Sequence, residues 1–94
     1  MHIGRVIGTA VATRKDERLT GSKFMVTQPL DKDFKPIGQT VIAVDTVGAG
    51  IGEVVLYTKG TAARIAANKR EAPLDAAIIG IVDNVDIYKE YLEE

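Results

Sequence analysis

The sequence predicts a mainly β domain, a small five-stranded barrel with one short α-helix before the last strand. Three features of the chain favour this class. Short runs rich in β-branched residues alternate with turn signals, as strands do. Glycines interrupt several runs, as they do where a barrel strand bends or another backbone comes close. One alanine-rich segment with helical spacing occurs late in the chain, ahead of a last apolar run.

The first two strands are expected at residues 2–13 and 22–29. Residues 2–13 alternate loosely between two faces and contain two glycines. Residues 14–18 are all charged, so they indicate an exposed connection. Residues 22–29 alternate again and end at Pro29, whose nitrogen has no hydrogen to donate to a ladder.

The stretch 41–60 is the centre of the pattern, because two apolar, β-branched runs flank the cluster Gly48-Ala49-Gly50-Ile51-Gly52. Glycine tolerates backbone angles at which a side chain with a Cβ would clash. We therefore expect strands at 39–45 and 53–59, joined by a sharp corner at 48–52.

The helix is expected at residues 61–70, with Thr61 as its N-cap. A helix this short does not persist alone, so it must dock on the sheet. Residues 74–82 are apolar throughout much of their length, which is typical of a strand buried on both faces. In residues 86–94, apolar pairs at i,i+4 spacing allow a short C-terminal helix. A helix inserted before the last of five strands is typical of an oligonucleotide-fold (OB-like) barrel.

The bulk properties predict one globular domain of 94 residues with 46% hydrophobic content. A chain of this size buries little more than ~60% of its unfolded surface, so it folds alone with little margin. The net charge of -1 disfavours a nucleic-acid binder. The absence of cysteine excludes disulfides and thiolate sites. Neither a signal peptide nor an apolar run of ~20 residues occurs, so we expect a soluble, cytoplasmic protein with no membrane association.

The glycine cluster does not have the pattern of a dinucleotide or phosphate loop. That fingerprint is G-x-G-x-x-G between a strand and a helix, where helix N–H groups meet the phosphates. Here Glu53 stands where the third glycine would be, and the residues after it are expected to form a strand. No G-K-[ST] sequence occurs either. We therefore predict no nucleotide cofactor.

Candidate catalytic and metal-binding residues are scarce. His2 is the only histidine and Ser22 the only serine, and neither has an evident partner for metal or nucleophile chemistry. Four carboxylates at expected strand ends could act as acid and base, although such residues more commonly bond nearby backbone N–H groups. They are Asp45, Glu53, Asp75 and Asp83. Arg64 could pair with one of them, within the chain or across a subunit interface. We predict no enzyme activity, no metal and no cofactor.

An OB-like barrel also indicates a second candidate function, the binding of single-stranded nucleic acid. That mode uses a positive groove with aromatic side chains on which bases stack. Phe34 lies in an expected loop, and Tyr88 and Tyr91 lie in the tail. Phe24 and Tyr57 lie on strands, where core or half-buried packing is the better interpretation. Nucleic-acid binding therefore stays the alternative, and a small-molecule enzyme is third, with no residues to name.

Four blocks of the chain carry a resemblance to a known family. They are MHIGRVIGTAVATRKDERLTGSKFMVTQPL, AVD with VGAGIGEVV, GTAAR, and PLDAAIIGIVD. In this order and spacing they resemble the EutN/CcmL family of bacterial microcompartment vertex proteins. Thr61 stands where a serine is expected, and both residues can cap a helix. The resemblance covers residues 1–83, as one barrel domain, and leaves 84–94 as a tail or short helix.

The resemblance implies a non-enzymatic shell component that forms homopentamers at the vertices of a polyhedral shell in the cytoplasm. Its partners would be copies of itself and hexameric or trimeric shell proteins of a metabolosome or a carboxysome. A ring of this kind needs two different surface patches that close after five copies. We expect the glycine corner near the five-fold axis or the adjoining subunit. The candidate interface or axis residues are Asp45, Gly48, Ala49, Gly50, Ile51, Gly52, Glu53, Arg64, Asp75 and Asp83.

Overall fold

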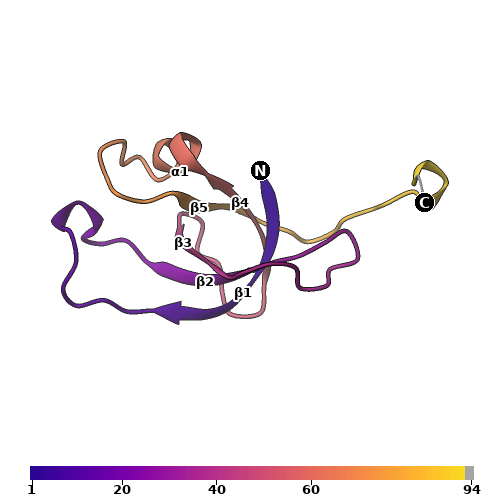
Figure 1. Cartoon of the computed structure of the whole chain (residues 1–94), viewed down its shortest axis with the longest axis horizontal. Coiled ribbons are helices and arrows are strands. Elements are labelled where there is room, and N and C mark those ends of the chain that lie inside the picture. The colour runs from indigo at the N-terminus through magenta and orange to yellow at the C-terminus, as the bar shows by residue number, and fades with distance from the viewer. Residues whose placement is uncertain (93–94) are drawn as a thin grey trace.

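Five strands form a closed barrel in the computed structural model of the chain, which describes residues 1–92 (Figure 1). The strands are β1 (His2–Ala10), β2 (Phe24–Pro29), β3 (Val41–Asp45), β4 (Val54–Lys59) and β5 (Ala76–Ile81). The helical elements are α1 (Gly60–Ala66) and two 3-10 turns, η1 (Glu17–Leu19) and η2 (Lys89–Tyr91). The predicted class, a mainly β barrel with one short helix before the last strand, is confirmed.

The order of strands around the barrel is β1-β2-β3-β5-β4, and the barrel closes because β4 also pairs with β1. All neighbours are antiparallel except β3 and β5, which are parallel. β1 therefore pairs with two strands. Its residues 2–5 pair with β4, and its residues 4–10 pair with β2. A bulge between Val6 and Gly8 interrupts its register with β2, and such a bulge bends the strand.

The apolar side chains form two clusters, one inside the barrel and one outside it. The inner cluster consists of Val6, Met25, Ala43, Ala49, Val55, Tyr57, Ala76 and Ile78. The outer cluster consists of Val44, Ala63, Ala72, Leu74 and Ala77, with Leu19, Phe24 and Ala67 packed against it. Because Ala63 is the buried residue of α1, the helix docks on the barrel through this outer cluster, as expected for so short a helix.

Helix α1 begins and ends earlier than the predicted range 61–70. Its N-cap is Lys59, which makes no side-chain capping bond, so the prediction that Thr61 caps the helix was wrong. Thr61 lies inside the first turn, where its Oγ1 accepts a hydrogen bond from Arg64 Nη2 at 2.9 Å. The helix ends before Asn68, whose φ of 56° lies in the left-handed region that commonly terminates helices.

The tail after β5 leaves the barrel and extends away from it at one end of the molecule (Figure 1). The short helix that its i,i+4 pairs allowed is reduced to the single 3-10 turn η2, within the described residues. Ile87 and Tyr91 form one such pair, but their side chains are 43% and 81% exposed. A helix of this length needs a surface to dock on, and most of the large apolar side chains of the tail stay exposed. Residues 93 and 94, which the expected helix included, lie outside the described residues.

Gly4 is the position where barrel closure depends most on a missing side chain. A Cβ there would lie 2.8 Å from Thr27 Cγ2 and 2.9 Å from the Gln28 carbonyl oxygen. We expect Gly4→Ala to lower the free energy of unfolding by ~1–3 kcal/mol, because the opposing backbone must shift. Urea unfolding measures this, with Gly8→Ala as the control, since a Cβ at Gly8 meets Val26 at an ordinary 3.8 Å. Equal unfolding midpoints for wild type and Gly4→Ala would contradict the prediction.

Candidate functional site

The loop between β3 and β4 wraps around the carboxylate of Asp45. Its Oδ1 accepts hydrogen bonds from the backbone N–H of Val47 at 3.0 Å and of Gly48 at 3.1 Å. Its Oδ2 accepts one from the N–H of Ala49 at 3.0 Å. Hydrogen bonds to a carboxylate are stronger than hydrogen bonds between neutral groups. These three hydrogen bonds together therefore define the conformation of the loop. The expectation that this carboxylate bonds nearby backbone N–H groups is confirmed.

Gly48 and Gly52 supply the bend of this corner. Their φ angles are 81° and 88°, a region that side chains with a Cβ rarely adopt. No atom lies within 4 Å of a Cβ built at either position, so the backbone angle rather than crowding requires glycine. Gly50 differs, because its N–H donates to Glu53 Oε1 at 2.5 Å and its Cβ would lie 3.2 Å from that atom. The predicted glycine corner is confirmed, and the close approach at Gly50 is to its own chain.

Hydrogen bonds hold the second half of the corner, Gly52 and Glu53, against β1. The backbone N–H of Gly52 donates to the Val6 carbonyl at 2.7 Å, and Val6 N–H donates to the Glu53 carbonyl at 2.9 Å. Arg5 Nη1 donates to the Gly52 carbonyl at 2.7 Å. These bonds join the corner to the strand that closes the barrel, so its outer surface has one defined shape.

The corner has a buried side and an exposed side. Ala49 points into the inner cluster, with 3% of its surface exposed. Val47 and Ile51 face outward and are 41% and 60% exposed. Because Asp45 and Glu53 already accept backbone N–H groups, the exposed side presents apolar side chains and bare glycine backbone. This composition suits contact with another protein surface better than recognition of a charged small molecule.

The other three candidate interface residues lie outside the corner. Arg64 Nη1 donates to the Leu74 carbonyl at 3.3 Å, and Nη2 donates to Thr61 as described above. Arg64 forms no ion pair within residues 1–92, so the pairing with a carboxylate of its own chain is not made. Asp75 and Asp83 are exposed. The structure thus brings Asp45 and Glu53 into one corner. Asp83 lines a hollow with Arg5 and Val54 beside that corner, and Arg64 and Asp75 lie at α1 and just before β5.

The residues considered for catalysis do not converge. His2 stacks on Tyr57 with ring centroids 5.1 Å apart, and its pKa is lowered by partial burial and then by the positive N-terminus and Lys59. Burial raises the pKa of Tyr57. Ser22 Oγ is buried and has no hydrogen-bond partner in the described part of the chain. Among residues 1–92, no group of three or more His, Asp or Glu side chains is placed to hold a metal ion.

The strand aromatics are packed rather than displayed for base stacking. Tyr57 is 1% exposed and belongs to the inner cluster, and Phe24 packs against the outer cluster. This confirms their interpretation as core or half-buried residues. The aromatic side chains that are most exposed, Tyr88 and Tyr91, lie in the tail. None of the helices described in residues 1–92 is both long and apolar enough to cross a membrane.

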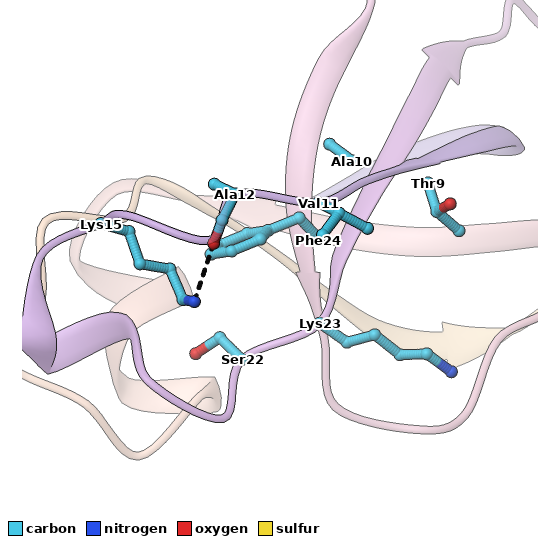
Figure 2. A pocket seen from close by; sticks show the side chains of 8 residues that line it. All are labelled: Thr9, Ala10, Val11, Ala12, Lys15, Ser22, Lys23 and Phe24. Atoms are coloured by element: carbon cyan, nitrogen blue, oxygen red, sulfur yellow. Dashed lines mark hydrogen bonds between the residues drawn. The ribbon is translucent and has the colours of Figure 1, made fainter.

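One surface groove was not predicted from the sequence. It has a volume of about 270 Å³ and lies between the end of β1 and the start of β2. Figure 2 shows the side chains that line it: Thr9, Ala10, Val11, Ala12, Lys15, Ser22, Lys23 and Phe24. The sequence signal was the charged run 14–18, which indicated an exposed connection but not the hollow beside it. We refer to these eight residues below as the β1–β2 groove.

Comparison with known proteins identifies the family. Residues 1–83 match the family described as "Ethanolamine utilisation protein EutN/carboxysome". The bacterial microcompartment shell vertex protein GrpN of Rhodospirillum rubrum (strain F11) is 46% identical over 86 residues, which cover 92% of this chain and 97% of GrpN. A solved structure of GrpN from that species, described as a pentameric microcompartment shell protein, has a TM-score of 0.86 and covers 94% of this chain and 100% of its own.

A second relative gives the same result. The carboxysome shell vertex protein CcmL of Gloeobacter violaceus is 44% identical over 87 residues, covering 93% of this chain and 87% of CcmL. Its solved structure has a TM-score of 0.88 and covers 93% of this chain and 90% of that one. The family match covers residues 1–83, and the two relatives are 46% and 44% identical to this chain over nearly its whole length. The chain belongs to the EutN/CcmL family.

Proposed function

We propose that this chain is a structural shell protein of a bacterial microcompartment that forms homopentamers at the vertices of the shell, in the cytoplasm. The observation that carries the proposal is the likeness to GrpN, a pentameric shell protein whose whole solved chain corresponds to 94% of this one. CcmL, a shell vertex protein of carboxysomes, supports the same role. The role is geometric and needs no catalysis or cofactor.

The physical basis of the role is curvature. A flat layer of six-fold units cannot close, and five-fold units supply the missing curvature at its corners. A small barrel is well suited to such a unit, because a monomer of this size buries a smaller fraction of its surface than a large domain does and gains stability from neighbours. Each copy then contacts its two neighbours through two different patches, and the ring closes after five copies. The further partners would be hexameric or trimeric shell proteins around the vertex.

We place the glycine corner near the five-fold axis or the adjoining subunit. Its outer side combines exposed Val47 and Ile51 with glycine backbone, so another protein can approach it closely. Arg64, Asp75 and Asp83 are candidates for interface or cap contacts, because none of them forms an ion pair within residues 1–92. In this arrangement residues 1–83 form the barrel unit of the ring, and residues 84–92 extend from it.

The assembly itself is the first prediction of this proposal. A ring of five 10.1 kDa chains has a mass of about 50 kDa. Size-exclusion chromatography with light scattering measures this mass directly, over a range of protein concentrations. A mass of one chain under all of these conditions would show that the proposed ring does not form.

The position of the corner gives a second prediction. Ile51 is 60% exposed, so Ile51→Glu leaves the monomer fold intact but buries a carboxylate if the corner lies at an interface. We expect the mass in light scattering to fall below that of the ring, with an unchanged circular dichroism spectrum. The control is Ile37→Glu, since Ile37 is 55% exposed on the loop after β2. If Ile51→Glu formed a full ring that was as stable to dilution as the wild-type ring, the corner would not lie at the interface.

A further inference from the structure

We propose that the tail of one copy, residues 84–92, docks in the β1–β2 groove of the next copy in the ring. The inference rests on the proposed ring and adds to it a named contact between neighbours. Four observations carry it: the exposed apolar side chains of the tail, the shape of the groove, the charges of the two segments, and their places at opposite ends of the molecule.

The tail exposes more apolar surface than a solvated segment of its length needs. Val85 and Ile87 are 39% and 43% exposed, and Tyr88 and Tyr91 are 66% and 81% exposed. Figure 1 shows that the tail runs away from the barrel instead of folding back on it. Large apolar side chains gathered in one exposed segment mark an interaction site. Tyrosine is also enriched at protein interfaces, where its ring is buried and its hydroxyl finds a partner.

The β1–β2 groove has the size and lining to accept a side chain from such a segment. Its volume of about 270 Å³ lies below the ~300–1,000 Å³ usual for small-molecule sites. Val11, Ala12 and Phe24 give it apolar walls, and Lys15 and Lys23 lie beside them (Figure 2). Ser22 also lines the groove, where its Oγ is buried without a hydrogen-bond partner among residues 1–92.

The two segments carry opposite charge. Residues 84–92 contain two acidic residues, Asp86 and Glu90, and one lysine. Residues 11–23, which lead from β1 into β2, contain four basic residues and two acidic ones. Arg18 and Asp16 already pair with each other at 2.7 Å, whereas Lys15 Nζ bonds only the Ala12 carbonyl and Lys23 forms no ion pair in the described chain. Lys15 and Lys23 can therefore receive the acidic tail of another copy.

The two segments lie too far apart to meet within one chain. In Figure 1 the segment between β1 and β2 lies at one end of the longest axis and the tail at the other. The molecule extends 49 Å along that axis and 23 Å and 22 Å across it. Two different, complementary patches at opposite ends produce head-to-tail contacts between copies, which is the interface type that a closed ring requires.

A disulfide cross-link tests the contact directly, because the chain contains no cysteine of its own. The variant carries Ala12→Cys in the groove and Tyr88→Cys in the tail, and its mass is measured by light scattering before mild oxidation. We expect a ladder of covalent species, from dimer to pentamer, on a non-reducing denaturing gel. The control pairs Tyr88→Cys with Arg70→Cys, an exposed position outside the groove, and should give no ladder.

The outcomes separate this inference from the proposed function. A five-chain mass without a ladder overturns the tail contact and leaves the ring intact. Linkage confined to single chains also overturns it, because the tail then folds onto its own barrel. An equal ladder from the control pair overturns it as well, since the tail would then reach any exposed site. A single-chain mass before oxidation overturns the ring and the contact together.

Charge reversal gives an independent test without cysteines. We expect Lys15→Glu with Lys23→Glu to raise the protein concentration at which the ring dissociates by about tenfold, because acidic tail and groove then repel. Adding Asp86→Lys and Glu90→Lys to that variant should restore most of the loss. Dissociation is followed by light scattering on dilution. An unchanged dissociation concentration in the double variant, or no recovery in the quadruple one, would overturn the charge-based contact.

Discussion

Closing five short strands into one barrel is the constraint on which the rest of the structure depends. β1 must pair with both β2 and β4, so it needs a bend and room for the opposite wall. The bulge beside Gly8 supplies the bend, and Gly4 supplies the room. The interior that remains is narrow, and Tyr57 fills it together with mostly small side chains. A barrel this small leaves many apolar side chains on its surface, so burying them against other copies of the chain would stabilise it.

In the corner between β3 and β4, acidic residues that were candidates for an interface stabilise the loop of their own chain. Asp45 and Glu53 are acidic residues on a prospective interface, yet their carboxylates accept backbone N–H groups of their own loop. These bonds, with Gly48 and Gly52 at positive φ, define the shape of the loop. The surface left for a neighbour is then apolar and shaped by these bonds. Association through it would lose little conformational freedom, since a preorganised surface has little left to order.

Much of the fold, but less of the candidate site, could be predicted from the sequence. The number of strands and their order along the chain follow from alternation and turn signals, and the corner follows from its three glycines. The first residue of the helix could not be predicted from the sequence. β4 runs directly into α1, and the Thr61 side chain bonds Arg64 instead of capping the helix. The β1–β2 groove is formed by the ends of two strands, and no pattern along the chain shows such a hollow. Which exposed side chain meets a second copy depends on a surface outside the chain.

The two kinds of contact would contribute differently to a ring. Apolar contact at the corner supplies affinity, whereas the charges of the groove and tail orient the approaching copy and exclude the wrong arrangement. Charge contacts between exposed groups are individually weak and are screened by salt. In a closed ring, however, each copy is held by two interfaces, and both must break before it leaves. Once one has broken, the other keeps the partners at a high local concentration, so a contact too weak to hold a dimer can still hold the ring.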